Sequence, residues 1–281
     1  MTALPFESDG DHGRGRGLAS IADLAPIDLT IAIPAHNEAL CIGRCLAAAI
    51  TDAARAVRDH GGPLAGKCIE IVVVDNASSD ETAAIAALHA GPARVAGIQL
   101  RVIAEPRKGL TRARQTGHEA ARGGIVAWID ADTEMPPGWL NRVAGLLAGD
   151  DVVCVSGPYR YPELSAIQRA MVVAYWWLIA APSYHLTGYM AVGGNFAVRR
   201  SAVDAIGGFD TRIAFFGEDT DIARRLAGLG RVVFNLGLVM PTSARRFAAD
   251  GFLRTGYRYA TNFLAEVILK RPLDTPYRDV R

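Results

Sequence analysis

Short apolar runs alternate with longer amphipathic segments through the first half of this chain. The runs are nearly continuous in Val, Ile, Leu and Ala, as in strands buried on both faces, and they cover 29–33, 69–74, 98–104 and 125–129. The segments between them carry apolar residues three and four positions apart, as amphipathic helices do, over 39–58, 78–88 and 110–122. Ser78 followed by Glu81 predicts a capping box at the start of the second of these helices. The alternation predicts an α/β fold: a single domain with a mostly parallel central sheet flanked by helices.

The alternation becomes less regular after about residue 150. Apolar runs predict strands over 152–156, 195–198 and 232–236, and helical spacing predicts helices over 163–181, 218–229 and 252–270. We interpret this half as an elaboration of the same domain. The predicted organisation is a flexible tail over 1–27, one α/β domain over 28–240 and a basic helical extension over 241–281.

The most apolar segment is Met171–Pro182, which contains Trp176 and Trp177. It is too short to span a bilayer, and the chain contains no run of eighteen apolar residues. The favoured interpretation is a buried helix. The alternative is an apolar lip that touches lipid or an apolar acceptor.

Composition narrows the class of protein. The chain has 281 residues, of which 50% are hydrophobic, and a net charge of +1, so it is globular and shows no general attraction to nucleic acid. The four cysteines have neither the number nor the spacing of a disulfide framework or a zinc site, and we expect them to be small core residues in a reducing compartment. The N-terminus lacks the pattern of a secretory signal. The expected location is therefore the cytoplasm.

Polar and acidic residues follow three of the predicted strands directly. The first strand runs into 34–38, which reads PAHNE, the second ends at Asp75-Asn76, and the fourth ends at Asp130-Ala131-Asp132. Because ligands of such sheets bind at the carboxyl ends of the parallel strands, we expect these side chains to share one site. Carboxylates completed by water and phosphate oxygens are suited to Mg²⁺ or Mn²⁺.

Further motifs occur in a fixed order along the chain, and together they resemble glycosyltransferase family 2. They are the segments 33–38 (IPAHNE), 73–82 (VVDNASSDET), Gly109 with 113–117 (ARQTG), 128–132 (WIDAD), 193–195 (GGN), 207–210 (GGFD) and 217–221 (GEDTD). The resemblance runs from about residue 29 to 236. It implies the GT-A nucleotide-sugar-binding fold and an inverting transfer of a sugar from a nucleotide-sugar donor.

The resemblance also implies individual roles. Asp132 would coordinate the metal together with Asp130, which would also contact the ribose or the sugar, and Asp75 would contact the base, usually uracil. Arg114 would reach the diphosphate or brace the acidic pair; Gln115 stands beside it where the family has Asn. The residues expected to bind the donor are Pro34, His36, Glu38, Asp75, Arg114, Asp130, Gly194 and Asn195.

The catalytic pair implied by the resemblance is Glu218 and Asp219. Asp219 lies where a helix is predicted to begin, and a helix dipole favours a carboxylate there. It would act as the general base that takes a proton from the acceptor hydroxyl. We expect a UDP-sugar donor, with guanosine and thymidine donors open, and a glycan, lipid or small-molecule acceptor.

Several alternatives stay open at this point. A polyprenyl-phosphate glycosyltransferase at the membrane surface is one, and a nucleotidyltransferase is another, although 35–38 (AHNE) replaces the Gly-rich phosphate loop of that class. A non-catalytic scaffold would be expected to lose the acids that this chain retains. A dinucleotide dehydrogenase would need a Gly-x-Gly-x-x-Gly motif after the first strand. No His follows Asp219, so a late His ligand is absent, and the Gln-x-x-Arg-Trp motif of processive synthases is absent too.

The C-terminal segment is basic. Residues 242–281 carry eight Lys or Arg against four acids. The segment 242–247 (TSARRF) could present arginines to the diphosphate or to an acceptor phosphate. Together with the Trp176-Trp177 segment, the basic charge permits a peripheral contact with the inner face of the cell membrane.

Overall fold

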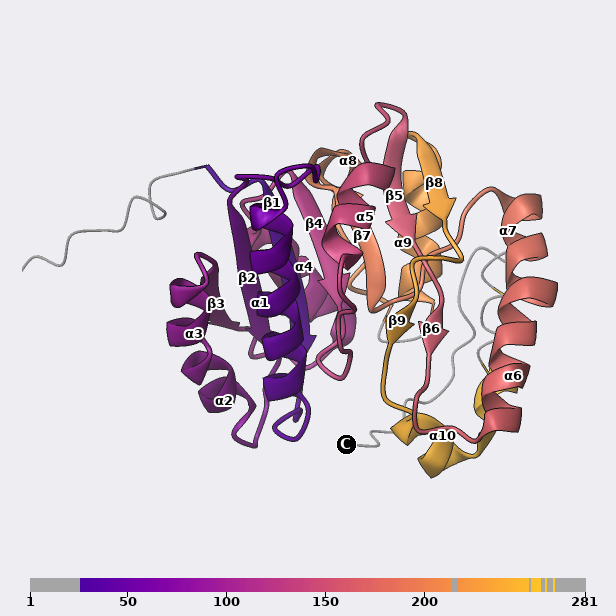
Figure 1. Ribbon diagram of the computed structural model, residues 1–281. Helices are drawn as coiled ribbons and strands as arrows, with labels where there is room; N and C mark the ends of the chain where they lie inside the picture. The colour runs from indigo at the N-terminus through magenta and orange to yellow at the C-terminus, as the bar shows by residue number, and fades with distance from the viewer. Residues whose placement is uncertain (1–25, 214–216, 253, 259–260, 262–264, 266–281) are drawn as a thin grey trace, which may run out of the picture.

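The computed structural model describes residues 26–213, 217–252, 254–258, 261 and 265. A central sheet and its covering helices make up this part of the chain (Figure 1). The strands are β1 (Leu29–Ala35), β2 (Ile69–Asp75), β3 (Gln99–Ala104), β4 (Ile125–Ile129), β5 (Val152–Ser156), β6 (Tyr159–Arg160), β7 (Asn195–Arg199), β8 (Arg231–Phe234) and β9 (Met240–Pro241). The helices are α1 (Ile42–Arg58), α2 (Thr82–Leu88), α3 (Ala90–Val95), α4 (Leu110–Ala120), α5 (Trp139–Leu146), α6 (Ala166–Tyr175), α7 (Ala181–Thr187), α8 (Arg200–Ala205), α9 (Glu218–Leu226) and α10 (Arg245–Asp250), with a π-helical turn, η2 (Trp176–Ala180), between α6 and α7.

The strand order of the main sheet is β3-β2-β1-β4-β7-β5-β8. The pairs β1–β2, β2–β3, β1–β4 and β5–β8 are parallel, and β7 is antiparallel to both of its neighbours. The prediction of a mostly parallel sheet is therefore confirmed. Because β7 runs in the opposite direction, its amino end lies at the same edge of the sheet as the carboxyl ends of β1, β2 and β4.

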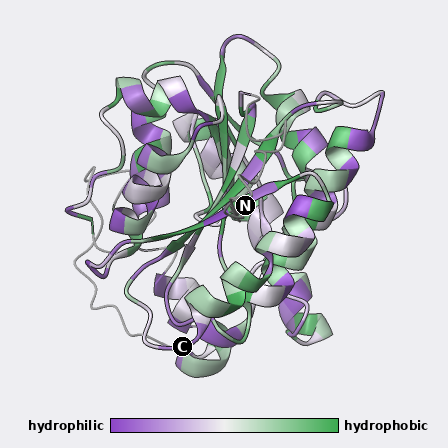
Figure 2. Cartoon of the chain, turned by 90° about the vertical axis from the view of Figure 1, so that its left-hand side faces the viewer, coloured by the Kyte–Doolittle hydropathy of each residue, from purple (hydrophilic) through white to green (hydrophobic). Residues whose placement is uncertain are grey.

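Each face of the sheet has its own core. Along β1, Ile31 and Ile33 pack in the same apolar cluster as residues of α1 and α5, whereas Ala32 belongs to the cluster formed with α8 and α9. This alternation follows from the two-residue period of a strand. Figure 2 shows the apolar strands lying between helices of mixed hydropathy. A rigid sheet buried on both faces fixes the loops at its carboxyl edge.

Helices α1 and α2 start later than the sequence predicts. Helix α1 begins at Ile42 rather than at residue 39. Helix α2 begins at Thr82, and the predicted capping box is absent: the Ser78 hydroxyl accepts a hydrogen bond from the Asn37 amide, and Asp80 Oδ1 accepts one from the Thr82 amide. Ser78 is thus used to join two loops, a long-range contact that local sequence does not reveal.

The interpretation of Met171–Pro182 as a buried helix is wrong. Helices α6 and α7 bury no residue, and η2 buries only Ala180. The three elements form one column at the edge of the molecule, to the right of the sheet in Figure 1. The column packs through a few aromatic contacts instead, including Trp176 against Phe234.

The remaining sequence predictions have mixed outcomes. All four cysteines are free thiols; Cys45 and Cys154 are buried and Cys41 and Cys68 partly so. Among the described residues, no helix is both long and apolar enough to cross a bilayer. Most of the predicted tail over 1–27 lies outside the described residues. The predicted helix 252–270 is only partly described, and the residues seen at 252, 254–258, 261 and 265 are helical.

Candidate active site

Asn76 ties together the loops that follow the first three strands. Its side-chain amide donates to the carbonyls of Glu105 and Arg107, at 3.1 and 2.9 Å, and its Oδ1 accepts from the Gly109 amide at 2.8 Å. Its own carbonyl lies 2.8 Å from His36 Nδ1. Asn76 therefore positions the start of α4 and the ring of His36 from one point at the sheet edge.

Asn37 performs a similar task between β1 and β2. It adopts a left-handed backbone conformation, with φ of 51°, which Asn tolerates better than most residues. Its Oδ1 accepts from the Ser79 amide at 2.8 Å, and the Glu38 amide donates to Thr82 Oγ1 at 2.7 Å. Much of the predicted 73–82 motif is thus explained by hydrogen bonds between loops.

Three predicted donor-binding residues lie at the ends of β1 and β2. Pro34 is buried within β1 and lies beyond the last pair of that strand with β4. His36 is buried beside it. Asp75 ends β2, and its Oδ1 is buried without a hydrogen-bond partner among the described residues. A buried carboxylate oxygen with no partner is costly, so Asp75 is suited to receive a ligand donor.

Arg245 joins two acids that were predicted to act at the donor site. The guanidinium forms ion pairs with Glu38 and with Asp132 Oδ2, at 2.9 Å for the latter. Arg245 begins α10, and Thr242 just before it donates to Asp132 Oδ1 at 3.4 Å. The segment after β9 therefore passes over Asp132, the candidate metal ligand, and Arg245 supplies a positive charge beside it. Sequence analysis pointed to the arginines of 242–247 but not to their partners. Arg245 and Glu38 are 207 positions apart in the sequence.

Arg114 contacts Glu218, one of the two acids of the predicted catalytic pair. It is only 1% exposed, and it donates to Glu218 Oε1 at 3.2 Å and to the Gly193 carbonyl at 2.6 Å. The same guanidinium lies 3.5 Å from Asp130 Oδ1 and stacks on the ring of Phe196. Of its two predicted roles, this geometry supports bracing, because the buried guanidinium is already bonded to Glu218 and to the Gly193 carbonyl.

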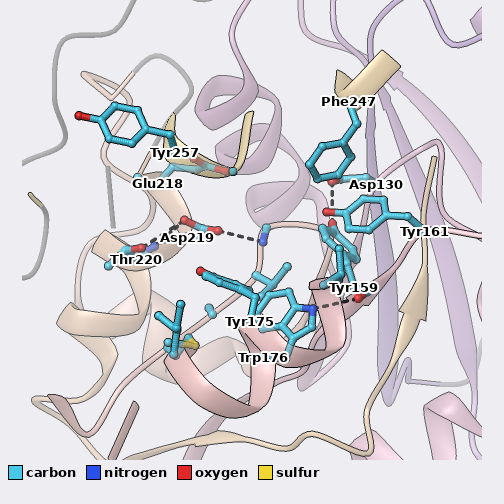
Figure 3. Close-up of a pocket in the computed structure, with 18 of the residues that line it drawn as sticks. Asp130, Tyr159, Tyr161, Tyr175, Trp176, Glu218, Asp219, Thr220, Phe247 and Tyr257 are labelled. Atoms are coloured by element: carbon cyan, nitrogen blue, oxygen red, sulfur yellow. Dashed lines mark hydrogen bonds between the residues drawn. The ribbon is translucent and has the colours of Figure 1, made fainter. Parts of the chain in front are cut away.

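Asp219 lies in the first turn of α9, as predicted. Its Oδ2 accepts from the Gly193 amide at 3.1 Å and its Oδ1 from the Thr220 amide at 2.8 Å. Burial raises the pKa of Asp219, partly offset by Arg114 and by these amides. The carboxylate is held rigidly and faces the cavity described below, beside Tyr175 (Figure 3).

Glu218 carries the second carboxyl of the pair. Burial, and next the negative charge of Asp219, raise its pKa from an ordinary value of 4.5 to about 8. The pKa values of both acids are raised, so the pair holds one proton between them over much of the neutral range.

The raised pKa of Glu218 predicts a pH dependence of stability. Between about pH 4.5 and 8 the folded protein holds a proton that the unfolded chain releases, so the free energy of unfolding falls as pH rises. The side chain of Glu218→Gln cannot ionise. We therefore expect this variant to lack the decrease in the free energy of unfolding, which is on the order of 1–4 kcal/mol across this range. Urea unfolding at pH 5 and pH 8 measures this, with the exposed Glu119→Gln as the control. Equal pH dependence in all three proteins would contradict the assignment.

A cavity of about 520 Å³ opens above these acids. Figure 3 shows Glu218 and Asp219 on one side and the rings of Tyr159, Tyr161 and Phe247 across from them. Its charged lining residues are Arg114, Asp130, Glu218 and Asp219, and the rest of the lining is mostly apolar and aromatic. The lining residues beyond those named are Leu110, Met171, Val172, Tyr175, Trp176, Ile179, Met190, Ala191, Val192, Gly193, Gly217, Thr220, Phe252, Gly256 and Tyr257.

Tyr159 is a part of this site that sequence analysis missed. Its hydroxyl donates to Asp130 Oδ2 at 2.9 Å, and burial together with the Asp130 charge raises its pKa well above the usual value. It therefore remains a proton donor and orients Asp130. No sequence signal marks it, because it belongs to a two-residue strand that pairs with β9.

The two predicted donor-binding residues of the 193–195 motif differ in placement. Asn195 is fully buried, with its amide bonded to Trp139 Nε1 and to the carbonyls of Pro158 and Leu238, so it shapes the loop and does not reach the cavity. Gly194 lies against the Asp130 carboxyl and the Tyr159 hydroxyl, and a Cβ there would overlap both.

We expect Gly194→Ala to lower catalytic activity by about 10²-fold, because displacing a positioned group by about 1 Å has that effect. Gly145→Ala is the matched control, since its Cβ would meet nothing within 4 Å. Steady-state rates and thermal unfolding of both variants measure the effect. Wild-type activity in Gly194→Ala would show that Asp130 tolerates displacement.

Asp130 and Asp132 fit a divalent cation whose remaining coordination positions are filled by oxygen atoms of a bound ligand. Among the described residues there is no cluster of three or more His, Cys, Asp or Glu that could hold a metal alone. Asp130 and Asp132 instead offer carboxylate oxygens at the end of β4, and Asp132 is already neutralised by a cation, the Arg245 guanidinium. One or two carboxylates plus phosphate oxygens is the set that Mg²⁺ commonly uses.

The sheet order, the acids at its carboxyl edge and the cavity beside them define a GT-A fold, the class in which nucleotide-sugar-dependent transferases are found. The chain belongs to glycosyl transferase family 2: the model of that family, "Glycosyl transferase family 2", matches residues 30–207, more than half of the sequence.

Curated relatives agree with this assignment. The probable glycosyltransferase YdaM of Bacillus subtilis is 26% identical over 211 residues, which is 72% of this chain and 47% of YdaM. Glycosyltransferase AglE of Haloferax volcanii is 32% identical over 138 residues, covering 48% of this chain and 41% of AglE. The chain thus spans less than half the length of these relatives.

Solved structures share the fold. The mannosyltransferase PcManGT of Pyrobaculum calidifontis, solved with GDP-Man and Mn²⁺, superposes with a TM-score of 0.64 at 22% identity, covering 88% of this chain and 66% of that one. Glucosyl-3-phosphoglycerate synthase of Mycobacterium tuberculosis, solved with Mn²⁺, UDP and glucosyl-3-phosphoglycerate, gives 0.53 at 20% identity, covering 90% and 84%.

Proposed function

We propose that this chain is an inverting, metal-dependent glycosyltransferase that moves a sugar from a nucleotide-sugar to an acceptor hydroxyl. The observation that carries the proposal is the Asp219 carboxylate, held by two backbone amides at the entrance of α9 and facing a cavity large enough for an acceptor. The neighbouring Glu218 is held in place by its ion pair with Arg114, at 3.2 Å.

In this mechanism Asp219 takes the proton of the acceptor hydroxyl. The acceptor oxygen forms a bond to the anomeric carbon from the face opposite the leaving group, and the bond from that carbon to the diphosphate oxygen breaks. The bonding electrons leave with the nucleoside diphosphate, so the anomeric centre inverts.

The donor is proposed to bind along the carboxyl ends of β1, β2 and β4. Asp75 would accept hydrogen bonds from the base through its unpartnered oxygen, with His36 and Glu38 beside it. Asp132, with Asp130, would hold Mn²⁺ or Mg²⁺ against the diphosphate. When bound, the cation neutralises charge that develops on the departing diphosphate. Arg245, which now pairs with Asp132, would have to leave that carboxylate or turn to the phosphates.

Uridine donors are our first choice, and a guanosine donor is the main alternative because neighbours of similar fold were solved with UDP and with GDP-Man. The proposal is tested by calorimetric titration with UDP, GDP and dTDP, with and without Mn²⁺. Binding of one nucleotide that requires Mn²⁺ supports the proposal and selects the donor class. If none binds under either condition, the acids do not form a donor site and the proposal fails.

A further inference from the structure

The helical column formed by α6, η2 and α7 exposes an unusual amount of apolar surface. Seven of its large apolar side chains are between 46% and 88% exposed. Exposed apolar patches of this kind mark interaction surfaces. We call these residues the apolar strip: Ile167, Met171, Val173, Trp177, Leu178, Ile179 and Leu186.

The strip is almost free of charge. The segment 164–192 contains no Asp or Glu, and its only Lys or Arg is Arg169. The Arg169 guanidinium turns back to the carbonyls of Pro162 and Leu164, at 3.2 and 2.8 Å. A partner that binds through complementary charge, such as a nucleic acid or a charged peptide, therefore finds little to recognise. Exposed Trp177 beside aliphatic side chains is instead the composition that favours the interface of a bilayer.

The strip is continuous with the cavity. Met171 and Ile179 belong to both, since each is about half exposed and each also lines the cavity wall. Trp176, next to exposed Trp177, lines the cavity and donates from Nε1 to the Tyr159 carbonyl at 3.1 Å. Across the mouth, Tyr257 is 73% exposed and also lines the cavity. The cavity thus passes from an acidic floor at Asp219 to an apolar rim that merges with the strip.

A protein that permanently covered the strip would also cover this rim. A second copy of the chain would have the same effect. A fluid lipid surface covers the strip and still lets molecules enter the cavity, because its components diffuse laterally and can extend into the mouth. This difference favours lipid over a protein partner.

We propose that the apolar strip lies in the surface of a lipid bilayer with the cavity mouth facing it, so that the acceptor is an amphiphile drawn from that membrane. The polar head of the amphiphile reaches Asp219, and its apolar tail leaves over Met171 and Ile179. The acceptor part of this inference rests on the proposed function, whereas the lipid contact does not.

Flotation with neutral phosphatidylcholine vesicles tests the lipid contact. We expect the wild-type chain to float with the vesicles, with little effect of salt, because the strip carries no net charge. The double variant Trp177→Gln/Leu178→Gln should bind the vesicles at least about tenfold more weakly than the wild-type chain. Neither residue lines the cavity, so nucleotide binding should be unchanged. Leu88→Gln is the matched control, at 76% exposure against 75% for Leu178.

The orientation is tested with vesicles of brominated phosphatidylcholine, which quench nearby tryptophans. Trp128 and Trp139 are buried in the core and give an unquenched background. In Trp177→Phe the quenchable signal comes from Trp176 at the cavity rim, and we expect it to be quenched. An unquenched Trp176 with vesicles bound would mean that the mouth faces away from lipid, which overturns the acceptor class.

Absence of vesicle binding, or equal binding by the double variant, would overturn the lipid contact. A dimer that disappears in the double variant would point to a second copy of the chain and overturn it as well. Nucleotide titration of the same samples separates the two proposals. Nucleotide binding without vesicle binding rejects only the lipid contact, and vesicle binding without nucleotide binding rejects only the proposed function.

Discussion

Asp219→Asn is expected to lower the rate of sugar transfer by about 10²–10⁴-fold, the range that a general base contributes. An amide has the size of the carboxylate but cannot accept the acceptor's proton. The nucleotide is proposed to bind through Asp75, Asp130 and Asp132 at the strand ends and not through Asp219, so its dissociation constant should stay within about twofold of the wild-type value. The measurements are initial rates with the donor selected by titration, and calorimetry with the corresponding nucleoside diphosphate.

Asp221→Asn is a matched control for this variant. Asp221 lies two residues further along α9, pairs with Arg224 and Arg225, and does not line the cavity. Asp221→Asn should keep a near wild-type transfer rate. This would show that loss of an arbitrary acid from α9 is not sufficient to lower the rate. If Asp219→Asn transfers at the wild-type rate, Asp219 is not the base. If it loses donor affinity instead, Asp219 is a binding residue.

The second large effect is expected from Asp132→Ala. Removing this carboxylate takes away the oxygen ligand proposed for the cation, and loss of a cation contact worth several kcal/mol corresponds to ~10²–10³-fold weaker Mn²⁺-dependent nucleotide binding. Binding measured without Mn²⁺ should change much less. Titration of nucleotide at fixed Mn²⁺, and in EDTA, separates the two contributions.

Asp151→Ala provides the control, since Asp151 forms a surface ion pair with Arg231 before the amino end of β5, at the opposite edge of the sheet from Asp132. Wild-type Mn²⁺ dependence in Asp132→Ala would reject the metal assignment. Because Asp132 also pairs with Arg245, the variant releases that guanidinium, and a gain in metal-free binding would indicate that Arg245 then contacts the phosphates.

The amino-acid sequence was sufficient to predict the strands of the main sheet and that most of them are parallel. The strands at Ile125–Ile129 and Val152–Ser156 have the predicted bounds, because a buried strand between turns carries an apolar run of its own length. It also located the acids at strand ends. Asp75, Asp130 and Asp132 meet at one edge because parallel strands share their carboxyl ends.

Only the tertiary structure decided what surrounds these acids. Arg114 meets Glu218 across 104 positions, and Arg245 meets Glu38 across 207, through a strand order and a chain crossing that no local pattern encodes. The raised pKa of Glu218 arises from that burial and from Asp219, so it too depends on the assembled site.

The helical column illustrates the same limit. Its sequence showed an apolar helix, but an apolar helix folds in the same way whether it faces a core or lies outside it. Local sequence determines helix and strand formation through backbone preferences and hydrophobic period, whereas burial depends on which other elements the chain brings alongside. Sequence therefore determined the sheet, the order of its loops and the acids at its edge, and the tertiary structure decided which of them share charge, which are buried and where the cavity opens.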